Sequence, residues 1–168
     1  MDIKPLPVPE LTTFGALIRH ALALEEFAVE LYKGLEQSYQ GNADLSRVFA
    51  DLAAQHGARQ KLLERTRREK LSEMILEPIE GLDGRLYVPK VHVTGAPGAA
   101  IQHGETAPDS ETALAGKGGI AFARELEGIC ARFYLDSARA ARMVLAEVSK
   151  VFERLAEDNR KNSDMIGG

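Results

Sequence analysis

The sequence predicts an all-α protein, a four-helix bundle with a long crossover connection between its second and third helices. Apolar residues recur at three- and four-residue spacing in four segments, the pattern of helices with one buried face. One such pattern occurs twice, from Ala21 to Tyr32 and from Ala123 to Tyr134, with Ala, Leu, Glu and Tyr at the same spacing. Between the copies lies a stretch rich in proline and glycine, which excludes a long helix. Two helical hairpins of one design, in a single domain of residues 1–168, are therefore expected.

The first hairpin is expected to contain helices over about residues 13–39 and 43–70. The start of the chain is rich in proline and should run extended. Thr12 or Thr13 can cap the first helix, because a threonine hydroxyl accepts a hydrogen bond from a free N–H of the first turn. Asn42 follows a glycine at the expected turn and can cap the second helix in the same way.

The connection, about residues 71–111, is unusually long for a compact domain. A topological reason for this length is that the second and third helices run parallel, so that the chain must return along the bundle. Within the connection, Arg85 to Val93 alternates like a short strand or hairpin, and Pro89 favours an edge position. We expect this segment to be a contact edge for a second copy of the chain.

The second hairpin is expected to contain helices over about residues 112–142 and 146–165. No proline or glycine separates these helices. The break is placed near Met143 to Ala146 by analogy with the first hairpin.

Composition and charge exclude several classes of function. The net charge is -4 and no basic patch stands out, which argues against nucleic-acid binding. No stretch approaches the ~20 apolar residues of a membrane span, and the proline-rich N-terminus is unlike a signal peptide. The single cysteine excludes an internal disulfide and cysteine-only metal sites. A cytoplasmic protein that binds neither nucleic acid nor membrane is therefore expected.

Polar residues interrupt the apolar face of each helix near its middle. The six residues of this predicted polar layer are Glu25, His56, Arg59, Glu127, Asn159 and Asn162. A buried carboxylate is costly unless it is paired or bound to a metal. Because Glu25 and Glu127 come from separate hairpins and meet at one level, they require a cation between them, either a metal ion or the guanidinium of Arg59.

Four segments of the chain resemble the rubrerythrin-like branch of the ferritin-like superfamily. They are E-x-x-A-x-x-L-Y at Glu25 to Tyr32, F-x-x-L-A at Phe49 to Ala53, E-x-x-C-x-x-F-Y at Glu127 to Tyr134 and F-x-x-L-A at Phe152 to Ala156. The resemblance implies a ferritin-like crossover bundle with a di-iron centre. In that centre the first and third helices each supply one Glu, and the other two helices each supply a Glu-x-x-His motif. Glu25 and Glu127 match the two single glutamates.

The chain departs from this pattern at the other four ligand positions. His56 and Arg59 stand where the second helix would carry Glu and His, and Asn159 and Asn162 stand at the same places on the fourth. The cysteine pairs of a rubredoxin-type iron site are also absent. The resemblance therefore implies a reduced metal site, mononuclear at most.

Two functions follow from this polar layer, and the sequence leaves both open. In the first, a metal-binding oxidoreductase, Glu25, His56 and Glu127 hold one Fe, Mn or Zn ion, and the electron donor is not identified. In the second, a non-enzymatic binding or oligomeric module, no metal is bound and Arg59 pairs with both glutamates. A homo-dimer or higher homo-oligomer is expected in either case.

Overall fold

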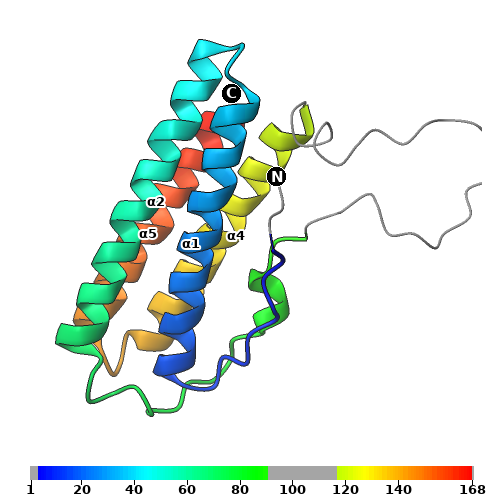
Figure 1. Cartoon of the computed structure of the whole chain (residues 1–168). Helices are drawn as coiled ribbons and strands as arrows, with labels where there is room; N and C mark the ends of the chain where they lie inside the picture. The colour runs from blue at the N-terminus through cyan, green and yellow to red at the C-terminus, as the bar shows by residue number, and fades with distance from the viewer. Residues whose placement is uncertain (1–3, 91–116, 168) are drawn as a thin grey trace, which may run out of the picture.

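The structure is a computed structural model that describes residues 4–90 and 117–167 (Figure 1). Four long helices make up most of the described chain: α1 is Phe14–Ser38, α2 is Ala43–Lys70, α4 is Lys117–Ala141 and α5 is Ala146–Gly167. The described residues form no strand, so the prediction of an all-α protein with four helices is confirmed.

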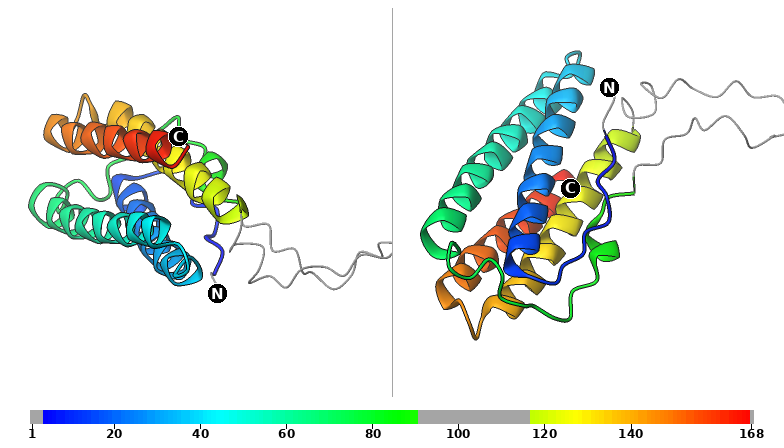
Figure 2. Two further views of the ribbon diagram at one scale, coloured as in Figure 1. Left: turned by 90° about the horizontal axis from the view of Figure 1, so that it is seen from above. Right: turned by 60° about the horizontal axis from the view of Figure 1, so that its bottom comes forward.

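The four helices form two antiparallel hairpins, α1 with α2 and α4 with α5, which pack on each other as two layers (Figure 2). In Figure 1, α2 and α4 both run from the upper end of the bundle to the lower end. Part of the chain between them, residues 91–116, lies outside the described residues. The full path of the predicted crossover therefore stays a prediction.

The two hairpins repeat one packing arrangement. In the first, the ring of Tyr32 stacks on that of Phe49, with centroids 6.1 Å apart. In the second, Tyr134 stacks on Phe152 with centroids 5.9 Å apart. All four rings are buried in the core. The repeat in the sequence therefore corresponds to a repeat in packing.

The helix starts in the first hairpin are capped by side chains. Thr13 accepts a hydrogen bond from the N–H of Ala16 at 3.1 Å, and Asn42 accepts one from the N–H of Leu45 at 3.2 Å. These were two of the predicted cap residues. The chain after α2 satisfies two further N–H groups of α1, because Phe14 and Gly15 donate to the carbonyl oxygens of Glu77 and Ile75.

Gly15 permits the close approach of this returning chain. A Cβ atom at Gly15 would lie 2.9 Å from the carbonyl oxygen of Ile75, which is too short for a real contact. The returning chain also pairs with the start of α1 through an isolated bridge between Thr13 and Pro78. The connection is thus held against the lower end of the bundle.

The predicted strand from Arg85 to Val93 is wrong where the structure describes it. Gly84–Tyr87 forms a short 3-10 helix, η1, and residues 88–90 are not a strand; residues 91–93 lie outside the described part. Asp83 caps η1 by accepting from the N–H of Arg85. The buried apolar residues of this run are Tyr87 and Pro89. Tyr87 packs against Phe133 of α4 and donates its hydroxyl to Asp136. Residues 84–90 therefore offer no strand edge for a second copy.

No helix among the described residues is both long and apolar enough to cross a membrane.

Candidate functional site

His56 of α2 lies between the two buried glutamates. Its Nδ1 is 2.6 Å from Oε2 of Glu25, and its Nε2 is 2.7 Å from Oε1 of Glu127. All three side chains are fully buried. Both ring nitrogens can donate to these carboxylate oxygens only when each carries hydrogen, which is the imidazolium form of the ring.

The surroundings of His56 stabilise this charged form. Burial by itself would lower the pKa of His56, but the charges and hydrogen bonds of Glu25 and Glu127 outweigh it and raise the pKa to about 9. The two carboxylates therefore meet around a cation, as the sequence predicted. The cation between them is a histidine.

Two tyrosines extend the contact on either side of His56. Tyr32 donates its hydroxyl to Oε1 of Glu127 at 2.6 Å, and Tyr134 donates its hydroxyl to Oε1 of Glu25. The result is a continuous hydrogen-bonded chain, Tyr134–Glu25–His56–Glu127–Tyr32, which we call the polar chain. Burial, followed by the charge of the neighbouring glutamate, raises the pKa of both tyrosines well above its usual value. Both hydroxyls therefore remain donors.

The polar chain explains why the sequence repeats. Glu25 and Tyr32 lie two turns apart on one face of α1, and Glu127 and Tyr134 do so on α4. Each tyrosine bonds to the glutamate of the other copy. The repeated stretch thus encodes a reciprocal exchange of hydrogen bonds between the hairpins, with His56 at its centre.

Glu127 has further partners through its second oxygen. Asn162 of α5 donates to Oε2 at 3.2 Å, and Nη1 of Arg59 lies 4.0 Å from the same atom. Although burial alone would raise the pKa of Glu127, the hydrogen bond and charge of His56, the hydroxyl of Tyr32 and the charge of Arg59 together lower it. Glu127 is therefore an ionised carboxylate.

Arg59 does not have the role predicted for it. In the second of the two functions left open by the sequence it pairs with both glutamates, but in the structure it has no contact with Glu25 and only the 4.0 Å approach to Glu127. Its Nη1 donates instead to Oδ1 of Asn159 on α5, at 2.7 Å. Nη1 also lies 3.4 Å from Nε2 of His56, but both groups carry hydrogen, so no hydrogen bond joins them. The long arginine side chain passes the polar chain and reaches the facing helix.

The two asparagines complete the layer by hydrogen bonding. Asn159 also donates to the carbonyl oxygen of Leu155, and Asn162 also donates to Oε1 of Gln55. Gln55 is a member of the layer that the sequence did not reveal, because it lies beside the apolar face of α2 and reaches inward only through its amide. All six predicted residues of the polar layer are buried.

The predicted metal ligands do not fit a single ion in this arrangement. A metal ion can bond only one ring nitrogen of a histidine, and the two nitrogens of His56 face different carboxylates on opposite edges of the ring. An ion that joined His56 to Glu127 would therefore leave out Glu25. Over residues 4–90 and 117–167, no group of three or more His, Cys, Asp or Glu side chains is arranged to hold a metal.

Removing either tyrosine hydroxyl is expected to destabilise the bundle. Each of Tyr32→Phe and Tyr134→Phe leaves a buried carboxylate without one donor, so the free energy of unfolding should fall by about 1–3 kcal/mol. The two losses should be similar because the tyrosines occupy equivalent places. Urea unfolding measures both, with Tyr87→Phe as the control, because the Tyr87 hydroxyl bonds to the partly exposed Asp136. Losses near zero for both variants would contradict the polar chain.

Comparisons of the chain with protein-family models, with curated proteins and with solved structures found no match. The resemblance to rubrerythrins therefore stays a prediction from the sequence motifs.

Proposed function

We propose that this protein is a non-enzymatic descendant of the ferritin-like bundle, a self-associating interaction module in which protonated His56 replaces the metal. The observation that supports this most directly is the position of His56, whose two ring nitrogens each face a different carboxylate. The imidazolium supplies the positive charge that a metal would supply to Glu25 and Glu127. The bundle can then keep both glutamates in its core without bound iron.

The burial of the polar chain also favours a structural role. Glu25, Tyr32, His56, Glu127 and Tyr134 have relative exposures of 0%. A substrate could reach them only if the helices moved apart. The nearby thiol of Cys130 would be a weak nucleophile. Burial raises its pKa well above the usual value, so the reactive thiolate does not form at neutral pH. We therefore assign the polar chain to stability and specificity of the fold.

The alternative function is a metal-binding oxidoreductase with one Fe, Mn or Zn ion on Glu25, His56 and Glu127. It is favoured by the meeting of these three ligand types at one buried level. It requires the His56 ring to turn away from one carboxylate, which would leave that carboxylate buried and unpaired.

The metal content of the purified protein separates the two functions. Protein prepared without chelator is expected to hold far less than one equivalent of Fe, Mn or Zn by mass spectrometry. Its melting temperature should not change on adding EDTA or any of the three ions, because a ligand that binds only the folded state raises stability. About one equivalent of metal, lost in Glu127→Ala, would overturn the proposal and support the oxidoreductase. Self-association is measured separately, by light scattering.

A further inference from the structure

A cleft of about 400 Å³ lies between the extended start of the chain and α1. Its outer wall is formed by Leu6, Pro7 and Pro9, in a segment that runs beside η1 (Figure 1). This segment is held against η1, because the carbonyl oxygen of Pro9 approaches Gly84 so closely that a Cβ atom would not fit there. Small-molecule sites in proteins have volumes of about 300–1,000 Å³, so the cleft is large enough for a small ligand.

His20 of α1 presents an unused hydrogen-bond acceptor to this cleft. It lines the cleft although the residue is only 5% exposed. Its Nε2 lies 2.9 Å from the carbonyl oxygen of Tyr87 and must therefore carry the hydrogen. Burial lowers the pKa of His20, so the ring is neutral and Nδ1 keeps its lone pair. Among residues 4–90 and 117–167, Nδ1 has no hydrogen-bond partner, yet it is not fully enclosed.

Two opposite charges on facing walls of the cleft are also unused. Glu10 belongs to the extended segment and Arg19 to α1, and both side chains are exposed. Within the described part of the chain neither makes an ion pair, not even with the other. A cleft that offers both charges favours a ligand that carries both.

The backbone at the start of α1 is already occupied. Phe14 and Gly15 donate their N–H groups to the connection, and Ala16 donates to the hydroxyl of Thr13. These N–H groups are therefore not free for an anion, although the start of a helix often binds one. A negative group in the cleft must be bound by a side chain, and Arg19 is the cation that lines it.

We propose that this cleft binds a small zwitterion with an apolar body, either a free amino acid or a short peptide. Its carboxylate contacts Arg19, whose planar guanidinium suits carboxylate geometry. Its ammonium group donates to Glu10 and to Nδ1 of His20. Its apolar body lies against the proline rings of the outer wall and leaves water there. The inference is independent of the proposed function, because no residue of the polar chain lines the cleft.

Isothermal titration calorimetry with two probes tests the ligand class. L-phenylalanine represents free amino acids, and the dipeptide phenylalanyl-leucine represents short peptides. We expect at least one to bind with a dissociation constant of about 1 mM or lower. Phenylpropionate lacks the ammonium group and phenylethylamine lacks the carboxylate, so each should bind at least about tenfold more weakly than the tighter probe. The tighter probe identifies the source of the zwitterion. No binding of either probe, or equal binding of the analogues, would overturn the proposal.

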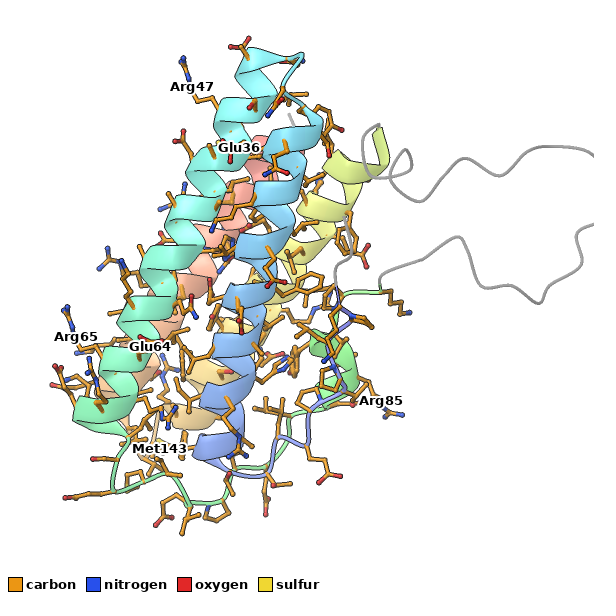
Figure 3. All side chains as sticks on the ribbon, viewed as in Figure 1. Glu36, Arg47, Glu64, Arg65, Arg85 and Met143 are labelled. Carbon is orange, nitrogen blue, oxygen red and sulfur yellow. The ribbon has the colours of Figure 1, made fainter. Side chains whose placement is uncertain are left out.

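Substitutions at the two charges test the location. Arg19→Gln and Glu10→Gln each remove one charge from an exposed position, so folding should be unaffected, and each should raise the dissociation constant at least about tenfold. The matched controls are Arg47→Gln and Glu64→Gln, because both residues are exposed and neither lines the cleft. Figure 3 shows Arg47 near the upper end of α2 and Glu64 near its lower end. Equal dissociation constants for variants and controls would place the ligand elsewhere and overturn the site.

The ring nitrogens of His20 provide a measurement that needs no substitution. Addition of the tighter probe should move the Nδ1 signal of His20 in a ¹⁵N NMR spectrum of the imidazole rings, because that nitrogen gains a hydrogen bond. The signals of His56 should stay in place, since both of its nitrogens already face carboxylates in the core. Binding that leaves the Nδ1 signal of His20 unmoved would contradict the proposed site.

Discussion

Replacing His56 with leucine is expected to lower the free energy of unfolding by about 3–5 kcal/mol. The substitution keeps an apolar side chain of comparable size in the core but removes the cation from between two fully buried carboxylates. Glu25 and Glu127 then each lose their contact with His56 and retain one tyrosine hydroxyl. Urea unfolding near neutral pH measures the loss.

The matched control is His20→Leu, because His20 is a buried histidine that has no carboxylate partner among residues 4–90 and 117–167. Its Nε2 donates to the carbonyl oxygen of Tyr87 at 2.9 Å, and burial lowers its pKa, so it is neutral. His20→Leu should cost less, about 1–3 kcal/mol for the unsatisfied carbonyl.

A second comparison identifies the cause of the loss. Adding Glu25→Gln and Glu127→Gln to His56→Leu removes both negative charges and should restore part of the stability, because the uncompensated charges carry most of the penalty. If His56→Leu is no worse than His20→Leu, or the added glutamines bring no recovery, His56 is not the cation of the core.

The meeting of Glu25 and Glu127 could be predicted because helix geometry alone determines it. Both residues lie on apolar faces, and equivalent positions in two copies of one hairpin come to one level when the copies pack. The same reasoning identified Asn159 and Asn162 as members of the layer. A periodic pattern therefore carries enough information to place residues at a level of the bundle.

The identity of the cation could not be predicted from the pattern. His56 and Arg59 lie one turn apart on the same face of α2, so spacing does not separate them. Side-chain shape decides between them. The short, rigid imidazole presents donors on two opposite edges and spans the gap between two carboxylates, whereas the longer guanidinium reaches α5.

The error in the predicted strand, over the described residues 85–90, has a different physical cause. Alternation of apolar residues over a short run does not distinguish a strand from an irregular segment in which Tyr87 and Pro89 are buried. The contact that decides the structure is non-local, because Tyr87 packs against Phe133 and bonds to Asp136 in α4. Local sequence does not contain that information.

Stability is expected to fall as the pH rises from about 6.5 to 9. The folded-state pKa of His56, about 9, lies above its ordinary value of 6.5. The native state therefore holds its proton more tightly than the unfolded state. The contribution of His56 to the free energy of unfolding is fully present below pH 6.5 and is lost as the pH rises through 9. At 1.36 kcal/mol per pKa unit, it amounts to about 3 kcal/mol.

Three other groups must be separated from His56 in this experiment. Burial lowers the pKa of His20, so its contribution is present above its ordinary value of 6.5 and is lost as the pH falls below it. Glu127 has a lowered pKa, so its contribution is present above its ordinary value of 4.5 and is lost only toward acid. Cys130 has a raised pKa, and its unfolded form ionises near 9.0, so it also removes stability at the alkaline end of the range. A Cys130→Ala background eliminates that contribution.

In the Cys130→Ala background, His56→Leu should make stability nearly independent of pH between 6.5 and 9, while the parent loses most of its His56 contribution. Urea unfolding at several pH values provides the comparison. A neutral His56 could donate to only one of its two carboxylates, and its stability contribution would not decline over this range. A flat or rising profile in the parent would therefore mean that His56 is uncharged in the folded protein, and the replacement of a metal by an imidazolium would fail with it.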